Sequence, residues 1–169
     1  MSNMRRKVGA LTLAALIIAA PSVAGVASSA DVVRTMSETI QGTSNAYRSN
    51  HGVGMTAVLS GLAPDQAHTV WAAIFNRPHN CFVPNACTTA DAFGDNPPVK
   101  WRLTQASRNY SDENGNSFFS GFIPTGADLQ RPNRAEIHFI YVEHSDAEGS
   151  SYMQLNSAGP GIGFSVHQH

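Results

Sequence analysis

The sequence is rich in histidine, with seven in 169 residues. Neutral imidazole is the commonest metal ligand in proteins, so a bound copper or zinc ion is the first chemistry to consider. His167 and His169 would lie about 6.6 Å apart on one face of an extended strand, which suits chelation. His51 and His138 could join a three-histidine site if the fold brought their strands together. These four histidines are the candidate metal ligands, although each alone also fits a hydrogen-bonded structural role.

The chain has two cysteines, Cys81 and Cys87, separated by five residues that include Pro84. An even number of cysteines in an exported protein predicts a disulfide. Closing so short a ring would contribute about 2 kcal/mol, so the bridge should hold a local loop rather than the whole domain. A cysteine-bound metal is the alternative, but the sequence contains no second cysteine pair to complete such a site.

Catalytic motifs are scarce. The sequence has no Gly-x-Ser-x-Gly nucleophile elbow and no glycine-rich phosphate loop, and its cysteines are expected to be oxidised. Asp91, Glu136 and Glu143 could act as general acids or bases, or could equally form a solvated rim. A hydrolase would need a histidine close to both a carboxylate and a nucleophilic hydroxyl. We therefore expect a protein that is not an enzyme, and keep a secreted hydrolase as the third hypothesis.

Aromatic side chains are the remaining candidates for ligand binding. Most of them lie on apolar strands, where a role in the core is more common. Trp101 differs because Lys100 and Arg102 flank it on a strand with one polar face. Asp91 lies in the long loop that precedes this strand. Trp101 and Asp91 are therefore the candidate ligand-binding residues.

The N-terminus has the pattern of a secretory signal peptide. Three basic residues at 5–7 precede an uncharged apolar run at 8–20, and small residues follow. These small residues favour cleavage between Ala30 and Asp31, with an earlier cut before Gly25 as the alternative. We expect export to the periplasm or out of the cell.

Removal of residues 1–30 leaves a single domain, 31–169, whose eight basic and twelve acidic residues give a net charge of −4. A chain of this length can bury a full hydrophobic core. The mature sequence has no Lys/Arg cluster and no segment apolar enough to span a membrane. This composition argues against nucleic acid and anionic membranes as partners, and leaves an unidentified small ligand or protein.

Strands must position these residues, because apolar and polar residues alternate with a period of two along most of the mature chain. Strands are predicted at 31–40, 53–60, 68–76, 99–107, 117–123, 135–143, 152–155 and 162–166. Residues 42–50 are polar and are predicted to form a turn, and the loop at 79–98 is long enough to need the disulfide as a staple. The predicted fold is an all-β antiparallel sandwich of about seven or eight strands.

One stretch resembles a known set of proteins. The segment GLAPDQAHTVWAAIFNRPHNC, followed by Cys87 and Asp91 and later by RAEIHFIYVEH, is similar to small exported bacterial proteins of unassigned function. The resemblance covers residues 53–144 and implies a β-sandwich without implying an activity. The turn at 61–64 also resembles the one before the His-x-His strand of copper-zinc superoxide dismutases and chordin-type repeats. Here the strand carries His68 without a second histidine, so superoxide chemistry is not implied.

The sequence thus predicts a non-enzymatic, exported β-sandwich that binds a small ligand or a protein partner and has no cofactor. A copper or zinc protein with histidine ligands is the first alternative. The distances between the histidines in the fold bear on both hypotheses.

Overall fold

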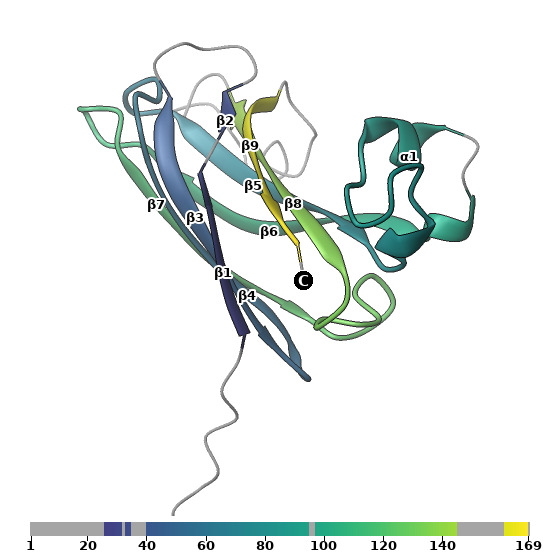
Figure 1. Ribbon diagram of the computed structural model, residues 1–169. Coiled ribbons are helices and arrows are strands. Elements are labelled where there is room, and N and C mark those ends of the chain that lie inside the picture. Colours follow the sequence, from purple (N-terminus) through teal and green to yellow (C-terminus); the bar gives the residue numbers. More distant parts are fainter. Residues whose placement is uncertain (1–25, 32, 35–39, 95–96, 145–160, 169) are drawn as a thin grey trace, which may run out of the picture.

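The computed structural model describes residues 26–31, 33–34, 40–94, 97–144 and 161–168. These residues form two antiparallel sheets that pack face to face (Figure 1). The first sheet has the strand order β1-β3-β4-β7, and the second has the order β2-β9-β8-β5-β6. The all-β sandwich predicted from the sequence is confirmed.

The strands are β1 (Val26–Asp31), β2 (Val33–Arg34), β3 (Gln41–Ser49), β4 (Gly52–Ser60), β5 (Ala67–Phe75), β6 (Trp101–Tyr110), β7 (Ser117–Pro124), β8 (Glu136–His144) and β9 (Gly161–His167). The short helical segments η1 (Pro78–Asn80), α1 (Thr89–Phe93) and η2 (Pro97–Val99) lie between β5 and β6. Among the residues that the structure describes, no helix is both long and apolar enough to cross a membrane. The strand predicted at 152–155 falls outside the described residues.

The hydrophobic core lies between the two sheets, because each strand turns every second side chain inward. Met55 and Phe119 of the first sheet and Ile74 and Phe139 of the second belong to one buried cluster. β5 lies between β8 and β6 and is buried along nearly its whole length. The apolar residues on both of its faces, visible in the sequence, fit this central position.

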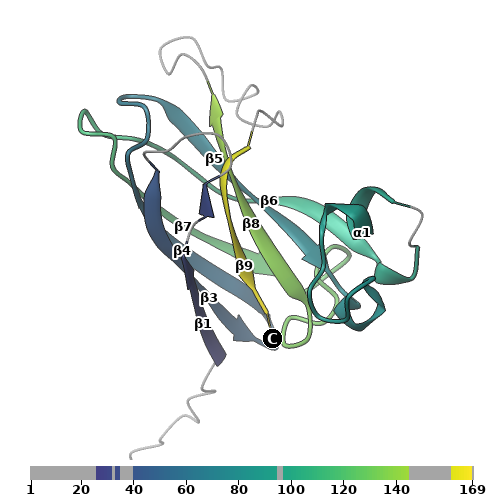
Figure 2. The ribbon, with the colours of Figure 1, turned by 45° about the horizontal axis from the view of Figure 1, so that its top comes forward.

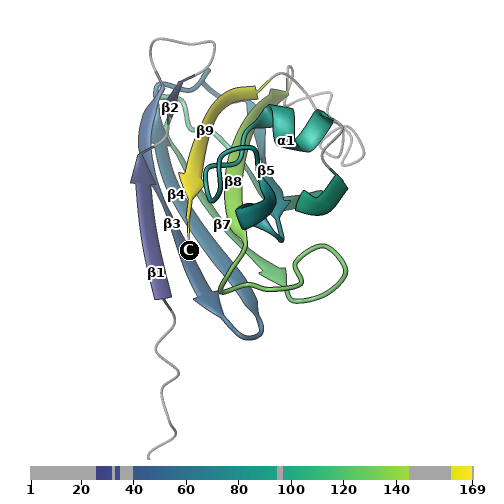
Figure 3. The ribbon, with the colours of Figure 1, turned by 45° about the vertical axis from the view of Figure 1, so that its right-hand side comes forward.

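The segment between β5 and β6, residues 78–94 and 97–99, forms a lobe beside the second sheet, which we call the disulfide lobe (Figure 2, Figure 3). The predicted disulfide between Cys81 and Cys87 is present, with Cα atoms 5.3 Å apart. Both cysteines pack with Phe75 of β5 in a second buried cluster. The lobe therefore covers part of the outer face of β5, which explains why both faces of this strand are apolar.

β3 occupies residues for which the sequence predicts a turn, 42–50, and that prediction is wrong. Gln41–Ser49 pairs with β1 on one side and with β4 on the other. Its inward positions carry Ser44, Ala46 and Arg48, so the apolar alternation typical of a strand is missing. The hydroxyl and guanidinium groups find hydrogen-bond partners inside the sandwich, which lets a polar sequence form an interior strand.

β1 begins earlier than the strand predicted at 31–40. It pairs with β3 over six residue pairs, and the side chain of Ser28 reaches the second sheet. Cleavage before Asp31 would remove five of the six residues of β1, whereas cleavage before Gly25 would keep the whole strand. An intact β1 therefore favours the earlier of the two cleavage sites, before Gly25.

Candidate functional site

The outer face of the second sheet, next to the disulfide lobe, brings together several residues that the sequence singles out. They are Cys81, Cys87, Asp91, Trp101 and His138. Alternation along β8 turns Glu136 and His138 outward, opposite Phe75 and Ala73 of β5 in the ladder. We refer to the disulfide lobe together with Trp101, Glu136 and His138 as the lobe site.

Glu136 joins the sheet to the lobe. Its side chain is fully buried, with 0% of its surface exposed. Oε1 accepts a hydrogen bond from the backbone N–H of Cys87 at 2.9 Å and lies 2.6 Å from Nε2 of His138. Oε2 has no hydrogen-bond partner among the described residues. Since a buried carboxylate is costly unless it is paired, the two contacts of Oε1 hold the lobe, the carboxylate and the imidazole together.

His138 is the more accessible member of this pair, with 15% of its side chain exposed. Its ring packs against Phe75 at a centroid distance of 5.0 Å. In the neutral tautomer that donates from Nε2 to the carboxylate, the lone pair lies on Nδ1. Such a pair can serve as a general base, or as a metal ligand with its supporting carboxylate. Among the described residues, no hydroxyl is hydrogen-bonded to His138.

Asp91 is buried and holds the lobe together from inside. Its Oδ1 accepts a hydrogen bond from the backbone N–H of Phe82 at 2.7 Å. Its Oδ2 accepts from the backbone N–H and the hydroxyl of Thr88 at 2.8 and 3.1 Å, a capping-box arrangement that starts α1. Both carboxylate oxygens are therefore occupied in fixing the shape of the lobe.

The lobe displays apolar side chains to solvent. Phe82, Val83 and Phe93 are 68%, 59% and 77% exposed. Phe93 also contacts the half-buried Trp101 edge to face, at a ring-centroid distance of 5.0 Å. All three exposed apolar side chains belong to one segment, whose backbone is fixed by the disulfide and by two buried carboxylates.

His167 lies on the opposite face of the same sheet, in a polar cluster between the two sheets that we call the inner cluster (Ser28, Ser44, Ser165 and His167). Its Nε2 is 2.7 Å from Oγ of Ser44, and its Nδ1 is 3.0 Å from Oγ of Ser28. Ser44 also donates to Oγ of Ser165 at 2.7 Å. Burial, and secondarily the charge of Arg48, lower the pKa of His167 to about 4. This histidine is therefore neutral and structural at pH 7.

The structure separates the groups that a hydrolase would need side by side. Among the described residues, the inner cluster places a hydroxyl next to a histidine without a carboxylate, and both groups are buried. The lobe site places a carboxylate next to a histidine, with no hydroxyl bonded to that histidine in the described part of the chain. Neither place, as far as the structure describes it, assembles the three groups of a hydrolytic triad.

The remaining candidate metal ligands are dispersed. His51 is exposed in the turn between β3 and β4, where its carbonyl accepts the N–H of Thr125 at 2.8 Å. His138 and His167 lie on neighbouring strands but belong to opposite faces of the sheet. His169 lies outside the described residues. Within the ranges that the structure describes, no group of three or more His, Cys, Asp or Glu side chains could hold a metal ion.

Three contacts that build these sites were not predicted from the sequence. Glu136 and His138 are two residues apart on a predicted strand, so their shared face could have been deduced from the spacing. The bond from Cys87 to Glu136 spans 49 positions of the chain, and the bond between Ser44 and His167 spans 123. No local pattern carries either of these long-range contacts.

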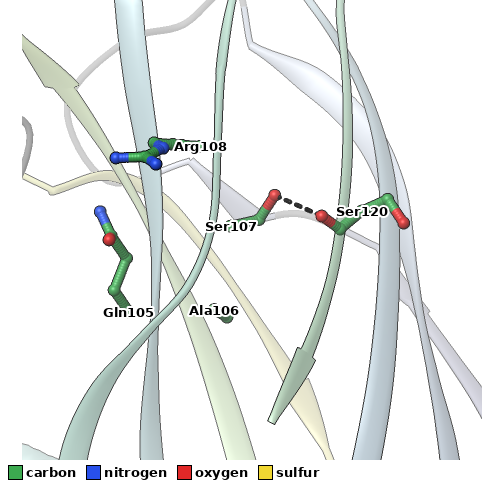
Figure 4. A pocket seen from close by; sticks show the side chains of 5 residues that line it. All are labelled: Gln105, Ala106, Ser107, Arg108 and Ser120. Carbon is green, nitrogen blue, oxygen red and sulfur yellow. Dashed lines mark hydrogen bonds between the residues drawn. The ribbon is translucent and has the colours of Figure 1, made fainter. Parts of the chain in front are cut away.

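A shallow hollow of about 250 Å³ lies where β6 approaches β7. Figure 4 shows its lining, which consists of residues 105–108 and Ser120. The hydroxyl of Ser107 donates to the carbonyl of Ser120 at 2.8 Å and so links the two strands. None of the candidate residues lines this hollow. It belongs to the edge of the sandwich rather than to the lobe site.

Comparison with known proteins found no match, since no family model, no curated protein and no solved structure matches this chain. The resemblance drawn from the sequence therefore stays a prediction. A functional assignment depends on the geometry of the lobe site.

Proposed function

We propose that this protein is an exported binding module that recognises a protein partner through the apolar surface of the disulfide lobe. The observation that carries this proposal is the exposure of Phe82, Val83 and Phe93 on a segment that is otherwise firmly held. Exposed apolar residues on a well-positioned loop are typical of recognition sites.

Rigidity favours binding, because a fixed loop loses little conformational entropy when a partner docks. The disulfide, the Asp91 cap and the bond from Cys87 to Glu136 fix the lobe before any partner arrives. Burying an exposed phenylalanine side chain contributes about 1.5–3 kcal/mol. Phe82 and Phe93 could therefore supply the apolar centre of an interface.

Site-specific photo-crosslinking tests this proposal. Benzoylphenylalanine would replace Val83 or Phe93 in the full chain, in the cells that export it. Phe118 is the matched control position, because it is 53% exposed on the outer face of the first sheet. We expect one discrete adduct with a second protein from the two lobe positions and none from position 118. The absence of any adduct, or the same adducts from all three positions, would contradict the proposal.

A histidine-bound copper or zinc ion is the second candidate. It is favoured by the pairing of Glu136 with His138, which is the arrangement of a metal ligand and its supporting carboxylate. Elemental analysis of the purified exported protein tests it. A stoichiometric metal that is lost in His138→Ala supports this candidate, and a metal-free protein that still crosslinks through the lobe rejects it.

A further inference from the structure

A second hollow, of about 420 Å³, lies at the end of the sandwich where the turn between β3 and β4 meets the loop between β7 and β8. It is lined by Asn50, Thr125 and residues 130–134. Two of these residues are arginines and none is acidic, although the chain as a whole carries a net charge of −1. The lining of the hollow is therefore positively charged, whereas the protein as a whole is slightly negative.

Hydrogen bonds hold the walls of this hollow in place. Thr125 donates through its N–H to the carbonyl of His51 at 2.8 Å, and through its hydroxyl to the carbonyl of Asn50 at 3.0 Å. The side-chain amide of Asn133 donates to Oδ1 of Asn50 at 2.9 Å, which joins the two loops. The hollow is thus formed before any ligand binds.

Two arginine side chains at the hollow are available to a ligand. Arg131 and Arg134 are exposed, and neither guanidinium has a hydrogen bond or an ion pair among the described residues. The backbone N–H of Arg134 donates to the carbonyl of Arg131 at 2.9 Å, so a tight turn fixes the spacing of the two residues along the backbone. Both guanidinium groups are therefore presented from one short, ordered segment.

Arg48 adds a third positive charge behind the wall of the hollow. It is buried, and its Nη1 donates to the carbonyls of Pro132 and Ala135 at 2.6 and 2.8 Å. Its Nη2 donates to the carbonyl of His167 at 2.9 Å. Among the described residues, its Nε has no partner and no carboxylate pairs with it. Since a guanidinium stays charged in proteins, Arg48 places a third positive charge next to the backbone of Pro132, which lines the hollow.

We infer that this hollow binds a phosphate or sulfate group through Arg131 and Arg134. A planar guanidinium presents paired N–H donors that match the oxygens of an anion, and two such groups suit an anion with three or four oxygens. The positive charge of Arg48 behind the wall of the hollow favours an anion over a neutral ligand. The free ion and its ester offer the same chemistry, so the experiment below distinguishes them.

Isothermal titration of the mature protein with inorganic phosphate, at constant ionic strength, tests this inference. We expect saturable binding at one site, with a loss of about tenfold in affinity in Arg131→Gln and in Arg134→Gln. Arg102→Gln is the matched control. Arg102 is an exposed arginine of β6 that lies outside the hollow, and its substitution removes the same charge. Its affinity for phosphate should equal that of the unmodified protein.

The inference is overturned if neither phosphate nor sulfate binds saturably, or if Arg102→Gln loses as much affinity as the other two variants. An equal loss would show attraction to the overall charge rather than binding in the hollow. Tighter binding of glycerol phosphate than of inorganic phosphate would identify an ester as the ligand. Equal or weaker binding of glycerol phosphate would identify the free ion.

Discussion

His138 and His167 lie on neighbouring strands of one sheet, yet they belong to different parts of the molecule. His167 is buried between the sheets and is bonded to neutral hydroxyls. His138 faces the disulfide lobe, is partly exposed and is bonded to a carboxylate. The difference teaches that burial and partners, rather than residue type, decide what a histidine does. The inner cluster should therefore control stability, and the lobe site should control binding.

The largest loss of stability should follow the removal of Arg48. Arg48→Ala leaves the carbonyls of Pro132, Ala135 and His167 without their donor, and a lost bond to a charged group costs about 1.5–3 kcal/mol. We expect the free energy of unfolding to fall by about 4 kcal/mol. Urea unfolding at pH 7 measures it. The exposed Arg102→Ala should lose less than about 0.5 kcal/mol, and equal losses in the two variants would refute the role of Arg48.

Acid should weaken the interior by a comparable amount, shared between two histidines. Burial lowers the pKa of His68 and of His167 to about 4 in the folded chain. The unfolded value is about 6.5, so the unfolded chain binds more protons between these two values. The stabilisation that is present above pH 6.5 is therefore lost as the pH falls toward 4. Between pH 7 and pH 5 we expect a loss of about 2 kcal/mol for each histidine.

Urea unfolding at pH 7 and pH 5 measures this loss. His68→Leu should remove about half of this loss, because it removes one of the two titrating histidines. The fold should tolerate leucine there, since the buried ring nitrogens of His68 have no hydrogen-bond partner among the described residues and the ring packs on Phe119. The exposed His51→Gln should keep the full pH dependence. A protein that is equally stable at both pH values would contradict the assignment of these histidines as neutral and buried.

Loss of the disulfide should lower the stability less than the loss of Arg48 does, and it should weaken binding of the partner more. Replacing Cys81 and Cys87 with serine opens a short ring, which lowers the free energy of unfolding by about 2 kcal/mol. The main core between the sheets does not include either cysteine, so the sandwich should stay folded. Photo-crosslinking from position 83 should fall sharply because the lobe is no longer held. Undiminished crosslinking would mean that recognition does not depend on the shape of the lobe.

N-terminal processing should change the inner cluster least, because it concerns a single hydrogen bond of that cluster. A chain that begins at Asp31 lacks five of the six residues of β1, including Ser28, whose hydrogen bond to His167 alone contributes about 1 kcal/mol. On the proposal that the chain is exported, we expect its mature form to begin at Gly25, which retains all of β1. The intact mass of the exported protein measures this. A mass that begins at Asp31 would show that β1 is not part of the exported fold.

The features that the sequence predicts correctly each depend on a local pattern or a count. Period-two alternation indicates the all-β class, and two cysteines indicate the disulfide. β3 escapes this logic because Ser44 and Arg48 occupy inward positions that normally carry apolar residues. Their partners lie more than 80 positions away in the chain, where no local pattern can reveal them.

The candidate sites were predictable only in part. Separate sequence patterns single out the disulfide, Asp91, Trp101 and His138. The fold brings all of them together at the lobe site. The role of Asp91 inside the lobe depends on backbone N–H groups that only the folded chain supplies. The sequence has no Lys/Arg cluster, yet the fold places Arg48 behind the loop that carries two further arginines. Such groupings arise from tertiary contacts alone.

The most direct test of the recognition surface is crosslinking from position 83 in a Phe93→Ser background, measured together with urea unfolding. Phe93 is 77% exposed, so its loss should lower stability by no more than about 1 kcal/mol while removing an apolar anchor. Phe118→Ser, on the other sheet, is the control and should keep the adduct. We predict that Phe93→Ser loses the adduct and remains folded. An adduct of unchanged yield in Phe93→Ser would contradict the claim that the lobe binds the partner.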